Sequence, residues 1–109
     1  MKVHVDFCLI PMGGDISVSA DVAECQQIFR ERGIKAVMHA YGTNLEGDWD
    51  VIMAAIKACH ERVHQLGRVR ISSTLKLGTR SDRDQTLEQK VDSVNARLAA
   101  AAARAVRLG

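Results

Sequence analysis

Hydrophobic and polar residues alternate along three segments of the chain, and this period of two predicts β-strands. The segments are residues 3–10, 34–41 and 68–77. Pro11 and the pair Gly13-Gly14 close the first strand, because proline and glycine interrupt regular structure. Residues 42–47 are predicted to form either a loop or a short further strand reached by a tight turn.

Three other segments repeat their apolar residues every three or four positions, which is typical of the buried face of a helix. Serine, aspartate and threonine are good N-caps, and glycine is common just after the last turn. Thr86 and Gln89 also have the spacing of a capping box. The last helix continues into an alanine-rich helical tail over residues 98–109. The predicted helices run from Ser19 to Gly33, from Asp48 to Gly67, and from Thr86 into this tail.

With residues 42–47 counted as a strand, the order of elements is β-α-β-β-α-β-α. Its beginning follows the ferredoxin-like βαββαβ pattern, so we predict an α+β fold with a four-stranded antiparallel sheet and an additional C-terminal helix. Right-handed crossovers place the two middle helices on one face of this sheet. The opposite face, which we call the outer face, is left to the final helix, to another subunit or to solvent. Residues 1–109 are predicted to form a single domain.

The composition narrows the class of protein. The 109 residues are 47% hydrophobic and 26% charged, which is typical of a globular domain. Aromatic residues make up only 4%, so a small aliphatic core is expected to complete its burial in an oligomer. A net charge of +2 argues against a nucleic-acid partner. Three cysteines with no metal-site spacing, and no apolar segment of about 20 residues, predict a cytoplasmic protein with no membrane partner.

One segment of the chain has the sequence of a known catalytic motif. His60, Glu61 and His64 form H-E-x-x-H, in which two histidines one helical turn apart bind zinc and the glutamate activates a water. The downstream glycine and histidine of the longer zinc motif do not follow, and the helical period points Glu61 away from the buried side. We therefore interpret the motif as a chance match and expect no metal, with a zinc hydrolase as the weaker alternative.

Five further segments, spread over the chain up to about Leu98, carry a resemblance to a known family. They are Leu9-Ile10-Pro11-Met12-Gly13, Ser17-Val18-Ser19, and residues 41–48, 70–80 and 86–94. In this order and spacing they resemble the thiamine-binding domain family, small ferredoxin-like proteins formerly catalogued as uncharacterised. One departure is visible, because Gly78-Thr79 stands where the family carries an acidic pair before the arginine. Any role of that pair in ligand binding or assembly is therefore open in this chain.

The resemblance implies a non-enzymatic cytoplasmic protein that binds thiamine or its hydroxymethylpyrimidine moiety and needs no other cofactor. It also implies a homodimer or homotetramer in which sheet faces pack together. A structural or regulatory oligomer without a small ligand is the alternative, and it predicts a stable tetramer that Glu46→Ala does not affect.

The chemistry of thiamine suggests which residues would bind it. Its flat aminopyrimidine needs an apolar or aromatic slot, and its cationic thiazolium favours a carboxylate or a ring face. Glu46 is the expected carboxylate, with Thr43 and Ser19 as hydroxyl partners. Tyr41 is expected to stack on the ligand, and Ile10 to line the slot. The same residue types also form helix caps, turns and interface cores, so each of these residues has a purely structural alternative.

Overall fold

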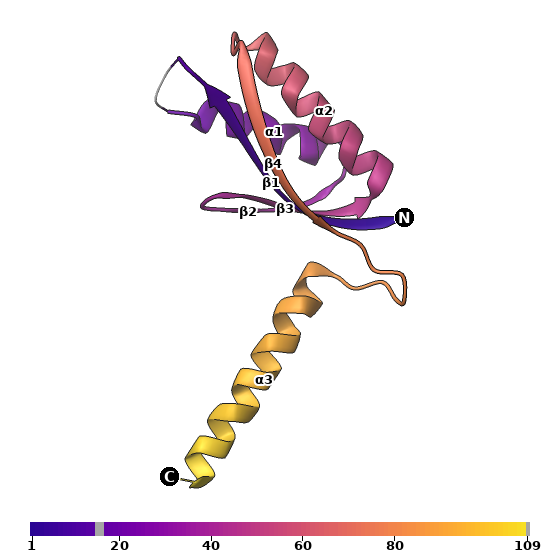
Figure 1. The fold of residues 1–109 in the computed structure, drawn as a ribbon, viewed down its shortest axis with the longest axis vertical. Coiled ribbons are helices and arrows are strands. Elements are labelled where there is room, and N and C mark those ends of the chain that lie inside the picture. The colour runs from indigo at the N-terminus through magenta and orange to yellow at the C-terminus, as the bar shows by residue number, and fades with distance from the viewer. Residues whose placement is uncertain (15–16, 109) are drawn as a thin grey trace.

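The computed structural model of the chain describes residues 1–14 and 17–108. The order of its elements confirms the predicted ferredoxin-like fold with an additional C-terminal helix, and it shows that residues 42–47 belong to a strand (Figure 1). The elements are β1 (Lys2–Met12), α1 (Ser19–Glu31), β2 (Lys35–His39), β3 (Gly42–Asp48), α2 (Trp49–Gln65), β4 (Arg70–Gly78) and α3 (Leu87–Leu108).

The sheet has the order β2-β3-β1-β4, and all neighbouring strands are antiparallel. Val5 in β1 lies opposite Leu45 of β3 on one side and Leu77 of β4 on the other. α1 and α2 cover one face of this sheet, as the right-handed crossovers predict (Figure 1). The outer face therefore carries the alternate residues of each strand.

The core lies between the sheet and the two covering helices. It is mostly aliphatic, as the composition predicts, and its one aromatic pair is Phe7 against Phe29, with ring centroids 6.0 Å apart in an edge-to-face arrangement. The buried hydrophobic residues are Val3, Val5, Phe7, Leu9, Cys25, Ile28, Phe29, Leu45, Ile52, Ala55, Ile56, Cys59 and Val63.

The strands on the two sides of β1 differ in length. Pairing with β3 ends at Phe7 opposite Thr43, where the β2–β3 hairpin turns back. Pairing with β4 continues to Met12 opposite Arg70. In the part of the chain that the structure describes, residues 8–12 of β1 therefore have a partner strand on one side only. This leaves a step in the sheet above the hairpin turn.

Most of the predicted helix ends are confirmed, but one is wrong. Gly33 and Gly67 follow α1 and α2 with φ of 66° and 105°, a left-handed conformation that glycine adopts without strain. Ser19 is not the N-cap of α1, because Val18 occupies that position and no side chain caps the helix. Ser19 lies inside the first turn, and its hydroxyl is 3.2 Å from that of Ser17 instead of a backbone amide.

α3 leaves the sheet at an angle and extends away from it, so that the molecule measures 60 × 33 × 20 Å (Figure 1). None of the described residues of α3 is buried. The helix therefore does not cover the outer face, which excludes one of the three arrangements that the sequence allowed. Over residues 1–14 and 17–108, no helix has the length and apolar character that crossing a membrane requires.

Candidate functional site

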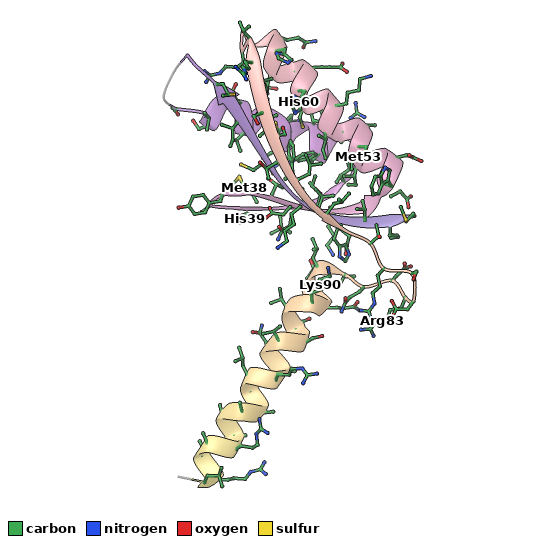
Figure 2. The ribbon with its side chains drawn as sticks, viewed as in Figure 1. Met38, His39, Met53, His60, Arg83 and Lys90 are labelled. Atoms are coloured by element: carbon green, nitrogen blue, oxygen red, sulfur yellow. The ribbon has the colours of Figure 1, made fainter. Side chains whose placement is uncertain are left out.

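The step beside β1 opens into a cavity of about 1030 Å³, which we call the notch. Two of its walls are residues 7–10 of β1 and residues 38–43 of the β2–β3 hairpin. The third comes from α1 and the residues just before it, namely residues 17–19, 22, 23, 25–27 and 30. Met38 and His39 mark the hairpin side in Figure 2. The notch exists because the hairpin ends before β1 does, which leaves an open strand edge beside the helix.

The notch brings together four of the five residues that the sequence suggested for a ligand. Ile10, Ser19, Tyr41 and Thr43 all line it. Thr43 is buried at 3% exposure, whereas Tyr41 is 88% exposed at the hairpin turn. The fifth residue, Glu46, does not line the notch.

The floor of the notch holds a polar pair that the sequence did not suggest. Gln26 of α1 donates a hydrogen bond from Nε2 to Thr43 Oγ1 of β3, with a length of 2.8 Å. This bond spans helix and sheet and fixes both side chains at the bottom of the notch. No motif or spacing marks Gln26, because the two residues meet only when the helix packs on the sheet.

One wall of the notch is held by an arginine that precedes β4, the strand on the other side of β1. Arg68, in the turn between α2 and β4, donates to the carbonyl oxygens of Gly13 at 2.8 Å and Ser17 at 3.2 Å. It also donates to Asp21 Oδ2 at 3.0 Å, and Asp21 is only 3% exposed. Gly14 needs its small size here, since a Cβ at that position would lie 2.5 Å from Arg68 Nη1. Arg68 thus ties Gly13, Ser17 and Asp21 to the turn before β4.

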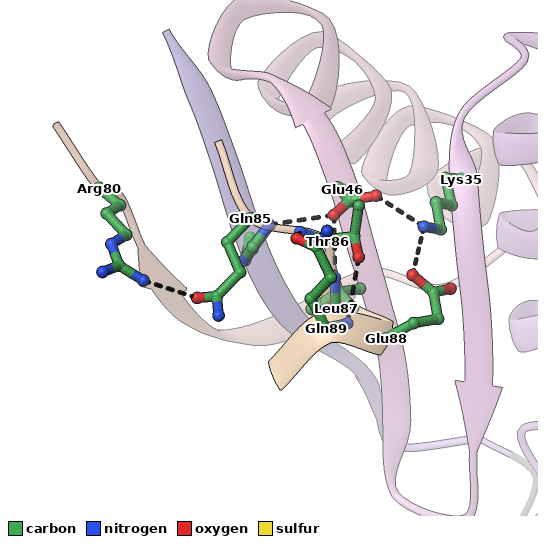
Figure 3. Close-up of polar contacts among 9 residues, drawn as sticks. Lys35, Glu46, Arg80, Gln85, Thr86, Leu87, Glu88 and Gln89 are labelled. Carbon is green, nitrogen blue, oxygen red and sulfur yellow. Dashed lines mark hydrogen bonds and ion pairs between the residues drawn. The ribbon is translucent and has the colours of Figure 1, made fainter. Parts of the chain in front are cut away.

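Glu46 lies on the outer face, where it joins the sheet to the start of α3 (Figure 3). Its carboxylate is 2.9 Å from Lys35 Nζ and 3.1 Å from His4 Nε2, and it accepts the backbone amide of Leu87 at 3.0 Å. Lys35 also pairs with Glu88 at 2.5 Å. Burial raises the pKa of Glu46, but Lys35, the Leu87 amide and His4 outweigh burial and leave the pKa below its ordinary value. We call these five residues the α3 latch.

The H-E-x-x-H histidines lie on α2 and both make hydrogen bonds within the protein. His60 Nε2 is 2.5 Å from Ser73 Oγ, and His64 Nδ1 donates to the Arg68 carbonyl at 2.7 Å. Burial lowers the pKa of His60, and the neighbouring His64 lowers it further. Glu61 is exposed. Within residues 1–14 and 17–108, no three histidine, cysteine, aspartate or glutamate side chains gather as a metal site would require.

The chain is similar to several known proteins. A family model described as thiamine-binding protein matches residues 5–95. UPF0045 protein sll0230 from Synechocystis is 56% identical over 94 residues, which cover 86% of this chain and 78% of that protein. UPF0045 protein ECM15 from Eremothecium gossypii is 44% identical over 100 residues, or 89% and 95% of the two chains. The crystal structure of MJ1052 from Methanocaldococcus jannaschii has a TM-score of 0.80 at 35% identity, covering 86% of this chain and 96% of that one.

Proposed function

The chain belongs to the thiamine-binding protein family, and from this premise we propose that it binds thiamine, or the hydroxymethylpyrimidine part of thiamine, in the notch without catalysing a reaction. The observation that carries the proposal is that one cavity collects Ile10, Ser19, Tyr41 and Thr43. These residues come from three different elements, and their types suit a flat heterocycle with a few polar edges.

The lining of the notch matches the pyrimidine better than it matches the thiazolium. Ligand sites are typically 300–1,000 Å³, mostly apolar, with a few placed hydrogen-bonding groups. In the notch these groups are the Ser19 hydroxyl, the Gln26–Thr43 pair and the open edge of β1. A neutral aminopyrimidine has donors and acceptors on its rim that can pair with such groups while its faces contact apolar side chains.

The cationic thiazolium needs a different neighbour. Among the described residues that line the notch there is no carboxylate, and Arg30 adds a positive charge. The exposed ring of Tyr41 offers a face to which a cation is attracted. We therefore place the pyrimidine against the floor and the thiazolium at the hairpin turn. The affinity for hydroxymethylpyrimidine should then be close to that for thiamine.

Titration calorimetry with thiamine, thiamine diphosphate and hydroxymethylpyrimidine tests the proposal. Ala23 is an exposed residue of α1 that lines the notch, so Ala23→Trp fills the cavity with little effect on the core. It should weaken thiamine binding at least about ten-fold. Glu46→Gln, on the outer face, should leave binding nearly unchanged.

Two results would count against a notch site. Absence of heat and of a thermal shift with millimolar ligand would remove thiamine as the ligand and favour an oligomer without one. Loss of binding in Glu46→Gln but not in Ala23→Trp would move the site to the outer face.

We also propose that the protein is a homodimer or homotetramer, assembled through the outer sheet face and α3. Apolar residues recur along α3 at alternating intervals of four and three, a 3.5-residue period that is typical of a helix paired with another helix. Those from Val91 onward are exposed. The residues of this seam are Leu87, Val91, Val94, Leu98, Ala101, Ala105 and Leu108.

The charges beside the seam favour a parallel pair of α3 helices from two copies of the chain. Lys90, Arg97 and Arg104 lie on one flank of the seam. In an antiparallel pair this basic flank would meet its own counterpart, whereas in a parallel pair it meets the other flank. That other flank carries Glu88 and Asn95. A parallel pair also brings both sheets to the same end, where their outer faces can meet.

A further inference from the structure

A second, smaller pocket of about 300 Å³ lies where β1, the loop after β4 and α3 meet. Lys2 and His4 of β1 line one side, and residues 78–80 and 83–85 with Lys90 line the other. Arg83 projects from the loop and Lys90 from the start of α3 (Figure 2). We call it the basic pocket. It shares no residue with the notch, so a ligand bound in it is independent of the proposed function.

The lining of the basic pocket carries a concentrated positive charge. Four lysine and arginine residues line it, namely Lys2, Arg80, Arg83 and Lys90, against Asp84 as the single carboxylate among its described residues. Arg80 is paired with Asp82, which lies outside the lining, so the other three cations less Asp84 leave an excess of +2 in this small space. Like charges held together repel, and a bound anion relieves this repulsion.

Arg80 uses its charge to shape the loop. It donates from Nε and Nη2 to the two carboxylate oxygens of Asp82, at 2.5 and 2.8 Å, and from Nη1 to Gln85 Oε1 at 3.0 Å. The pairing lowers the pKa of Asp82, so both partners are charged near neutral pH. Lys2, Arg83 and Lys90 make no ion pair within residues 1–14 and 17–108, so their charges are available to a ligand.

The side that carries Lys90 is held in place before any ligand arrives. The capping box of Thr86 and Gln89 starts α3, and the Leu87 amide is bonded to Glu46. Lys90 follows within the first turn of that helix. A cation on an ordered element binds an anion with a smaller loss of conformational entropy than one on a free chain.

We propose that the basic pocket binds a compact phosphate-bearing molecule, such as diphosphate or a small diphosphate ester. Arginine matches two phosphate oxygens with its planar fork, and lysine adds a point charge, which is the combination that Arg83 supplies with Lys2 and Lys90. The volume, at the low end for ligand sites, suits a diphosphate with little beyond it. A bound anion would bridge β1 to the start of α3 and strengthen the α3 latch beside it.

Titration calorimetry of the full chain with inorganic diphosphate, and with inorganic phosphate for comparison, tests this site. Diphosphate should bind to one site per chain, more tightly than phosphate, and more weakly as salt is added. The double variant Arg83→Gln/Lys90→Gln should weaken binding at least about ten-fold. The matched control is Arg104→Gln/Arg107→Gln, which removes the same charge from the far end of α3 and should change affinity less than about two-fold.

Two outcomes with diphosphate would overturn the proposal. One is no saturable binding of diphosphate at about 10 mM and low salt. The other is equal weakening in both double variants, which would show attraction to the net charge of the chain. Thiamine itself carries no phosphate, so its binding to Arg83→Gln/Lys90→Gln should match that of the unmodified chain. A loss of thiamine binding in this variant would show that thiamine itself uses the basic pocket, which would overturn a separate phosphate site.

Discussion

The notch and the basic pocket are each shaped by an arginine paired with an aspartate, but the two pairs lie in different surroundings. At the notch, the side chains of Arg68 and Asp21 are 13% and 4% exposed. At the basic pocket, those of Arg80 and Asp82 are 43% and 60% exposed. Water screens the second pair and not the first. The same contact therefore determines the stability of the fold at one end of the sheet and only the shape of a loop at the other.

The largest expected effect comes from breaking the buried pair. Asp21→Ala removes the carboxylate from the buried Arg68 guanidinium, and such a change typically costs about 3 kcal/mol of unfolding free energy. It also removes the partner that orients Arg68 toward Ser17 in the lining of the notch, so thiamine affinity should fall as well. Urea unfolding followed by Trp49 fluorescence measures the first effect, and calorimetry measures the second.

Asp82→Ala is the matched control, because it removes the same group from the exposed pair. The midpoint of urea unfolding should hardly change, because water screens this exposed pair, and thiamine affinity should not change. Equal losses of stability in the two variants would contradict the distinction between a structural pair and a loop-shaping pair.

The second prediction contrasts α1, which packs on the sheet, with α3, none of whose described residues is buried. If two copies pair through α3, Val94→Glu/Leu98→Glu places charges in the seam and should weaken association by about 2 kcal/mol or more. Ala96→Glu/Ala103→Glu, on the side of α3 away from the seam, adds the same charge and should leave the assembly intact. Light scattering with size exclusion gives the mass of each variant; an unchanged mass in the first would exclude α3 from the interface.

The third prediction uses acid to separate the two ends of the molecule. The pKa of Glu46 in the folded protein is below its ordinary value of 4.5. As the pH falls, Glu46 therefore binds a proton more readily when the chain is unfolded, or when α3 has detached, than when the latch is closed. The contribution of the α3 latch is therefore complete above about pH 4.5 and is lost as the pH falls through the lowered pKa. Glu88, whose pKa is lowered mainly by its hydrogen bond to Lys35, loses its ion pair in the same direction.

Amide hydrogen exchange at Leu87, corrected for its intrinsic pH dependence, reports the release of the latch. Protection should fall below about pH 4.5, and Glu46→Gln should remove this pH dependence. The Gln26–Thr43 bond in the notch joins two side chains that do not titrate, so it should persist over the same pH range. Protection at Leu87 that does not change down to about pH 3 would show that another contact holds the start of α3.

The sequence predicted the fold because its signals are local. Alternation marked β1, β2 and β4 but left residues 42–47 as either a loop or a strand. Gly33 and Gly67 marked helix ends, and Thr86 with Gln89 marked the capping box. The sequence could not predict at which residue of β1 the β2–β3 hairpin ends. That difference in strand length creates the notch, and it depends on register between strands distant in sequence.

The placement of the candidate residues shows the same limit. Thr43 and Glu46 are three positions apart on one strand, so strand alternation directs them to opposite faces, and only Thr43 reaches the notch. The residues that the sequence missed, Gln26 and Arg68, act through partners far along the chain. Charge alone did not mark the basic pocket, because Asp82 and Asp84 alternate with its cations and obscure the local excess.

The smallest effect is expected at the capping box of α3. Thr86→Ala removes the side-chain oxygen that accepts the Gln89 amide at 3.1 Å, a loss of about 1 kcal/mol of local helix stability. Because no described residue of α3 is buried, this loss should fray the first turn and lower the helical circular dichroism slightly. For an unpaired α3 the midpoint of urea unfolding should stay unchanged, whereas the proposed pairing with a second copy predicts a small decrease. A shifted midpoint would mean that α3 folds together with the sheet, as it would if a second copy held it there.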